Sequence, residues 1–227
     1  MIYVMSDLHG NWDDFSGMLE EISFDKNDKL YILGDLIDRG DNPIEIIDYV
    51  MENRNVFLIL GNHEDMMLKY YENREQKDHE RWMRNGGGVT QAAFESLNQL
   101  KRNDIIGFFN SAPLFLELED YCLVHAGIKI TESEEFNPFK QTRRDLVWIR
   151  NEFFENPTGL EKKVIFGHTP TVMLRYTDIE KRPDEKMSIW YDDKNGDKIG
   201  IDCGVAYPEY GGRLGCLRLN DMVEFYI

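Results

Sequence analysis

Cysteine is scarce in this chain, which has only Cys122, Cys203 and Cys216 among its 227 residues. No two of them form a C-x-x-C pair, so zinc-ribbon and thioredoxin-like sites are excluded. Three cysteines do not make an even disulfide set, which favours buried, reduced thiols. We therefore expect a cytoplasmic protein.

Basic residues, histidines and long apolar runs are also in short supply. The sequence has five histidines, and 26 Lys and Arg residues stand against 42 Asp and Glu residues, a formal net charge of −16. Such an acidic chain disfavours nucleic acid and anionic membranes as partners. Apolar runs stay far below the ~20 residues that span a bilayer. Residues 1–10 are expected to form a strand and not a signal peptide.

What the sequence does contain is a repeated order of short apolar run, polar turn and helix. The length and the 42% hydrophobic content suit a single domain over residues 1–227. Alternating strands and helices predict an α/β fold with partly parallel pairing. Residues 65–111 are predicted to be a helical insert over the site, interrupted by Gly86-Gly87-Gly88.

Four local predictions follow from turn and helix patterns. Asn11 is expected to cap a helix, and the next helix is expected to bury Ile44, Ile47 and Met51. One helix is predicted over 145–154. The remainder of the chain is β-rich, with Asn195-Gly196 at the turn of a hairpin.

Polar side chains gather where five predicted strands end. The clusters are Asp7 with His9, Asp35 with Asp38 and Arg39, Asn62 with His63, His125 alone, and His168 alone. Sites in α/β sheets form beyond the carboxyl ends of the strands, so these clusters could surround one point. A single histidine after a strand is more often structural, but four of five histidines in equivalent places indicate a shared site. Carboxylates and imidazoles without cysteine suit two divalent ions, manganese first and iron or zinc as alternatives.

Five ordered motifs resemble those of the calcineurin-like metallophosphoesterases. They are Asp7-Leu8-His9-Gly10, Gly34-Asp35-Leu36-Ile37-Asp38-Arg39-Gly40, Gly61-Asn62-His63-Glu64, His125-Ala126-Gly127 and Gly167-His168-Thr169-Pro170. Within that superfamily the chain is most similar to the serine/threonine phosphoprotein phosphatases of bacteria and phages, through Asp38, Glu64 and Arg150. The resemblance implies two packed, mixed β-sheets flanked by helices. A dinuclear metal site would lie at the carboxyl ends of the strands.

The resemblance also implies a role for each motif residue. The implied metal ligands are Asp7, His9, Asp35, Asn62, His125 and His168, with Asp35 shared between the two ions. His63 would protonate the leaving alkoxide, with Asp38 orienting it. Arg39 and Arg150 would bind the phosphate, although Arg150 could also be a solvated helix residue.

Four residues near these motifs receive a more modest interpretation. Glu64 is taken as a helix-start residue stabilised by the helix dipole, and Asp202 as a residue that shapes a turn near the site. His79 lies in a charged run and is predicted to be on the surface. Trp82 could belong to the core or to a substrate cleft, and the sequence favours neither.

The implied function is hydrolysis of phosphoserine and phosphothreonine monoesters by direct attack of a metal-bound hydroxide. The partner would be a phosphorylated protein or peptide, with tyrosine phosphatase activity as a side reaction. The alternative within the superfamily is a symmetrical hydrolase of dinucleoside polyphosphates such as diadenosine tetraphosphate. Those enzymes typically lack the acid that matches Asp38, so its presence favours phosphomonoesters. A catalytically dead module that binds phosphorylated partners is disfavoured, since all six ligands and His63 are present.

Overall fold

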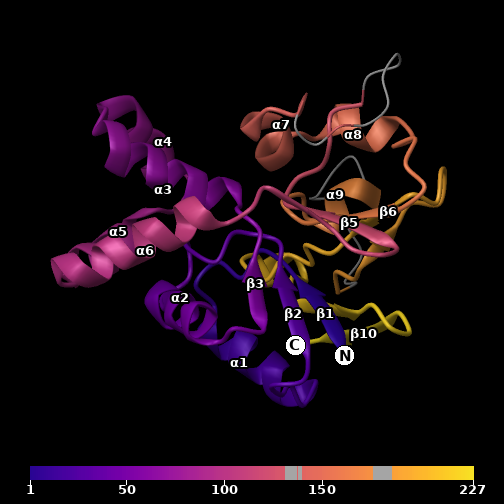
Figure 1. The fold of residues 1–227 in the computed structure, drawn as a ribbon, viewed down its shortest axis with the longest axis horizontal. Coiled ribbons are helices and arrows are strands. Elements are labelled where there is room, and N and C mark those ends of the chain that lie inside the picture. The colour runs from indigo at the N-terminus through magenta and orange to yellow at the C-terminus, as the bar shows by residue number, and fades with distance from the viewer. Residues whose placement is uncertain (131–136, 138–139, 176–185) are drawn as a thin grey trace.

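Two five-stranded β-sheets form the centre of the molecule in a computed structural model that describes residues 1–130, 137, 140–175 and 186–227 (Figure 1). The first sheet has the order β10-β9-β1-β2-β3, and the second has the order β4-β5-β6-β8-β7. The first comprises β1 (Ile2–Met5), β2 (Lys29–Ile32), β3 (Val56–Leu58), β9 (Gly215–Arg218) and β10 (Val223–Tyr226). The second comprises β4 (Phe115–Glu117), β5 (Tyr121–Val124), β6 (Lys163–Phe166), β7 (Trp190–Tyr191) and β8 (Lys198–Gly200).

Both sheets are mixed, as the resemblance implied. Strands β1, β2 and β3 run parallel, as do β5, β6 and β8, while antiparallel strands flank each parallel group. Side chains alternate across β1: Val4 packs into the layer between the sheets with Leu123 and Ile165, whereas Tyr3 and Met5 face a second, helix-covered layer. The predicted pair of packed sheets flanked by helices is therefore confirmed.

Two helices cover the outer face of the first sheet, α1 (Trp12–Glu21) and α2 (Pro43–Glu52). The buried side of α2 consists of Ile46, Ile47 and Val50. The predicted burial of Ile47 is confirmed, whereas Ile44 and Met51 lie at the margin of this face, half-buried against the core. Asn11 does not cap α1: its side-chain amide donates instead to the carbonyls of Leu8 and His9.

Residues 65–111 are mainly helical, as expected. Four helices occupy this part of the chain: α3 (Asn62–Asn73), α4 (Gln76–Arg84), α5 (Gly88–Ser96) and α6 (Gln99–Ser111). Figure 1 shows them extending together away from the two sheets. Within the described residues, no helix is both long and apolar enough to cross a bilayer.

The segment between β5 and β6 differs from the prediction of a single helix over 145–154. It forms two short helices, α7 (Arg143–Trp148) and α8 (Asn151–Glu155), separated where Ile149 and Arg150 leave helical geometry. The break lets the Arg150 guanidinium reach Thr169, to whose hydroxyl it donates at 2.7 Å. Further along the described part of the chain lie α9 (Thr171–Arg175) and a 3-10 helix, Pro208–Tyr210. The hairpin with Asn195-Gly196 in its connection is confirmed, since β7 and β8 pair antiparallel.

Candidate metal centre

Strained backbone is concentrated in the turns that follow the parallel strands. Nine described non-glycine residues have positive φ, and six of them are predicted site residues: Asp7, His9, Asp35, Asp38, Arg39 and His168. L-residues adopt this region rarely, and such strain persists only where the surroundings enforce it, commonly at functional sites. The geometry thus marks the same turns that the sequence motifs marked.

Hydrogen bonds tie these turns to one another across both sheets. In the first sheet, the amide of Asp7 donates to the Gly34 carbonyl, and the amide of His9 donates to the Asp35 carbonyl. Between the sheets, the His168 amide donates to the Asp7 carboxylate at 2.9 Å. The predicted ligand residues from both sheets are consequently brought to one place.

Glu64 holds the turn that carries Asp35. Its carboxylate is fully buried and accepts hydrogen bonds from the amides of Asp35 (2.9 Å), Leu36 (2.8 Å) and Gly61 (3.0 Å). A Cβ at Gly61 would lie 2.2 Å from Asp35 Oδ1, so no larger residue fits there. Glu64 therefore does more than start α3: it joins the first turn of this helix to the turn after β2.

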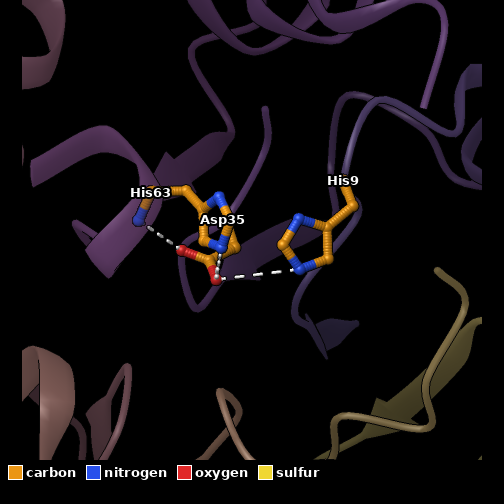
Figure 2. A group of neighbouring side chains, drawn as sticks. All are labelled: His9, Asp35 and His63. Carbon is orange, nitrogen blue, oxygen red and sulfur yellow. Dashed lines mark hydrogen bonds and ion pairs between the residues drawn. The ribbon is translucent and has the colours of Figure 1, made fainter. Parts of the chain in front are cut away.

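Asp35 lies between the two groups of predicted ligands. Figure 2 shows its carboxylate between the rings of His9 and His63, and Oδ2 is 3.8 Å from Nε2 of each. Oδ1 accepts the backbone amide of His63 at 3.0 Å and lies 3.5 Å from His125 Nε2. This central place suits a carboxylate that two cations share.

The imidazoles present unprotonated nitrogens to the site. Nδ1 of His9 donates to the Ile37 carbonyl at 3.1 Å, and Nδ1 of His63 donates to Asp38 Oδ2 at 2.6 Å. Since a neutral ring carries one proton, Nε2 of each is an acceptor, and both accept from the Arg39 guanidinium, at 2.8 and 3.2 Å.

The second group presents lone pairs that suit a cation. Nδ1 of His125 donates to the Leu33 carbonyl at 2.6 Å, which leaves Nε2 of the neutral ring as an acceptor. That Nε2 faces another acceptor, Asn62 Oδ1, at 2.8 Å, and His168 Nδ1 lies 2.8 Å from the same oxygen. Lone pairs that converge in this way are the donor set of a metal ion.

Burial and mutual repulsion perturb the acids and bases of the site. Burial first, and then the charges of Asp202 and Asp35, raise the pKa of Asp7 well above its ordinary value. Burial first, and then Glu64, raise the pKa of Asp35 in the same way. Burial also holds the pKa of His9, His63 and His168 well below the ordinary histidine value, so these rings are neutral. Divalent cations would offset the repulsion between the carboxylates, and neutral imidazole is the ligand form.

A cavity of about 280 Å³ opens onto these side chains. Its polar lining comprises Asp7, His9, Asp35, Asn62, His63, His168, Arg39, Arg150, Asn85 and Asp202. Its other lining residues are Trp148, Pro170, Met173, Met187, Tyr207 and Tyr210. Asp202 also accepts the Gly204 amide at 2.9 Å, in keeping with the predicted turn role. The cavity can therefore hold an anion beside an apolar, aromatic wall.

His79 and Trp82, to which the sequence assigned no catalytic or metal-binding role, lie outside the cavity lining. His79 is half-buried and not a surface residue, because its ring bonds to Gln91 at 2.8 Å and packs against Tyr70. Trp82 belongs to the core and not to the cavity lining, yet its indole N–H reaches the Asp38 carboxylate. The sequence carried no signal of that contact, since 44 residues separate the two.

Known proteins resemble this chain in both sequence and fold. A family profile described as "Calcineurin-like phosphoesterase" matches residues 1–204. The chain is 30% identical over 131 residues to a symmetrical bis(5'-nucleosyl)-tetraphosphatase of Wigglesworthia glossinidia brevipalpis, covering 56% of this chain and 44% of that protein. It is 24% identical over 250 residues to the asymmetrical bis(5'-nucleosyl)-tetraphosphatase PrpE of Geobacillus thermodenitrificans. That match covers 97% of this chain and 91% of the other protein. The chain thus spans less than half the length of the first relative.

Solved structures share the fold at lower identity. A protein named provisionally as a diadenosine tetraphosphatase superposes with a TM-score of 0.70 at 17% identity, over 100% of this chain and 92% of the other. A protein serine/threonine phosphatase from Saccharomyces cerevisiae superposes with a TM-score of 0.63 at 17% identity, over 95% of this chain and 71% of the other. Identities this low establish the common fold alone.

Proposed function

The chain belongs to the calcineurin-like phosphoesterase family, and on that premise we propose that it hydrolyses phosphoserine and phosphothreonine monoesters. The family uses a dinuclear divalent metal site, and this chain clusters histidine and aspartate side chains where such a site would lie. The observation that carries the proposal is the 2.6 Å contact between His63 and Asp38. An alkoxide leaves only if it is protonated, and this pair can supply the proton.

Six residues would hold the two cations. As the family resemblance implies, Asp7 and His9 would bind the first, Asn62, His125 and His168 the second, and Asp35 both. The structure itself groups His9, Asp35 and His63 within ligand distance of one another, and likewise Asp35, His125 and His168. When bound, the cations supply electrostatic stabilisation of the phosphoryl oxygens and activation of the attacking water. We propose manganese, with iron or zinc as alternatives, and a cytoplasmic location.

The protein's own side chains would bind the phosphate and deliver the proton. The bond from Nδ1 to Asp38 turns His63 so that its Nε2 faces the cavity. Burial lowers the pKa of His63, so its Nε2 would take up a proton only with a phosphate dianion bound beside it, while the Asp38 carboxylate stabilises the charged ring. That proton would then pass to the leaving oxygen. Arg39 and Arg150 line the same cavity, and their guanidinium groups suit the oxygens of a phosphoryl group.

A second candidate function is hydrolysis of dinucleoside polyphosphates. Several similar proteins carry that name, and the wall formed by Trp148, Tyr207 and Tyr210 offers rings on which a nucleobase could stack. The leaving group would then be a phosphate, which needs little protonation. The buried His63–Asp38 pair would have no purpose in that reaction, so we rank it second.

One comparison of substrates tests the proposal. The protein is loaded with Mn²⁺, and kcat/KM is measured on a phosphothreonine peptide and on diadenosine tetraphosphate. We expect the peptide to be the better substrate. A preference for the dinucleotide of more than about tenfold, a difference of ~1.4 kcal/mol in transition-state binding, would make the second candidate the function. Turnover of neither, with two metals bound, would favour the phospho-binding module.

A further inference from the structure

The carboxylate of Asp38 has a second partner besides His63. Trp82, at the end of α4, directs its indole N–H to both oxygens, at 3.1 Å to Oδ1 and 2.9 Å to Oδ2. Oδ2 also accepts from His63 Nδ1 at 2.6 Å. Among the described residues, the indole supplies the only hydrogen bond to Oδ1. The indole therefore fixes the rotation of the carboxyl group about its Cβ–Cγ bond.

Hydrogen bonds to the α4–α5 region also hold the backbone around Asp38. The amide of Asp38 donates to the buried hydroxyl of Thr90 in α5 at 2.9 Å, and the amide of Arg39 donates to the Gly86 carbonyl at 3.2 Å. Asp38 and Arg39 both have positive φ, so their turn needs outside contacts to persist. Thr90 of α5 and the short connection between α4 and α5 supply those contacts.

Trp82 itself has little freedom to move. Its side chain is fully buried and packs against Tyr70 and Tyr71, with ring centroids 5.9 and 6.0 Å away. On its other side, a Cβ at Gly87 would lie 2.5 Å from the indole nitrogen. Close packing from several sides gives the N–H a single direction, towards Asp38.

We propose that Trp82 is a positioning residue for the His63–Asp38 pair, an inference that rests on the proposed function. It acts through Asp38, whose carboxylate it keeps in the plane that meets His63 Nδ1. Without the indole N–H, the carboxyl group can rotate and the His63 ring loses its fixed direction. The step that depends on Trp82 is protonation of the leaving oxygen. Metal binding and phosphate binding do not depend on it.

The dependence on leaving group separates this role from a purely structural one. Trp82→Phe keeps an aromatic ring in the core but removes the N–H. For this variant we expect kcat on a phosphothreonine peptide to fall by about tenfold, a fraction of what a general acid contributes, with KM within about twofold. Turnover of p-nitrophenyl phosphate, whose leaving group needs little protonation, should stay within about threefold of wild type. Equal losses on both substrates would overturn the inference.

Three further variants make the outcome decisive. Trp190→Phe removes an indole from β7, away from the cavity lining, and should leave both substrates unaffected. Thr90→Val removes the acceptor of the Asp38 amide without loss of volume, so it gives the same selective loss in milder form if Trp82→Phe folds poorly. His63→Ala reports on the acid itself. If His63→Ala loses activity mainly on the peptide while Trp82→Phe loses it equally on both substrates, only the role of Trp82 is overturned. If His63→Ala also loses activity equally on both substrates, the proposed acid is overturned as well.

Discussion

Two buried clusters of charge in this molecule are built on opposite principles. Around the cavity, the carboxylates of Asp7 and Asp35 lie close together, and burial raises the pKa of both. Around Lys198, the buried ammonium group contacts Asp192 at 3.0 Å and Asp197 at 2.7 Å. Burial alone would raise the pKa of Asp192 too, but the bonds from Lys198 and from the amides of Lys194 and Asn195 lower it to about 2.

The two clusters differ in whether the folded chain supplies the charges that balance their carboxylates. The Lys198 cluster contains its own counter-charge, so the folded chain is enough to satisfy it. In the cavity cluster, buried carboxylates repel one another beside neutral imidazoles. Arg39 and Arg150 offset part of that charge, and divalent cations would offset more. The ion pairs of the first cluster are complete within the fold, whereas the second cluster keeps like charges buried together, an arrangement common at functional sites.

The largest expected effect comes from breaking the cavity cluster at Asp35. Asp35→Asn keeps Oδ1 for the His63 amide but removes the charge that two cations would share. We expect kcat to fall by about 10³-fold or more, with less than two metals bound per chain by elemental analysis. The metal-free variant should nevertheless melt at a higher temperature than the metal-free wild type, because a repelled buried charge has been removed.

An exposed carboxylate provides the control for that experiment. Asp193→Asn, beside the Lys198 cluster, should change neither activity nor melting temperature. If metal-free Asp35→Asn melted below the wild type, the cavity carboxylates would be stabilising as they stand, and the contrast between the two clusters would fail.

A smaller effect is expected from breaking the Lys198 cluster. Lys198→Met leaves the buried Asp192 without its cation, which should cost about 3–5 kcal/mol of unfolding free energy in urea. The metal-loaded folded protein should keep its kcat, since Lys198 does not line the cavity. Lys194→Met, at an exposed lysine of the same hairpin, should change stability by less than about 0.5 kcal/mol. A loss below 1 kcal/mol in Lys198→Met would mean that the pair is not needed.

The sequence predicted the two clusters very unequally. Asp7, His9, Asp35, Asn62, His125 and His168 could be found because each follows a strand within a short motif, and the structure brings all six together. The contacts of Trp82 and Glu64 could not, because they join segments separated by 44 and up to 29 residues and depend on how the helices pack. The burial of Lys198 was equally invisible, since its hairpin shows only ordinary turn and strand residues.

The smallest expected effect is the pH dependence of stability that Asp192 contributes in the Lys198 cluster. The pKa of Asp192 is about 2 in the folded protein against an ordinary value of 3.8. Its folded pKa is depressed, so its contribution to stability is fully present above the ordinary value and is lost as the pH falls towards 2. The loss is about 2 kcal/mol, from 1.36 kcal/mol per pH unit. Urea unfolding of the metal-free wild type and of Asp192→Asn, between about pH 5 and pH 2, measures it. The wild type should lose about 2 kcal/mol more than the variant over that interval, and parallel curves would show that Asp192 is not held as an ion pair.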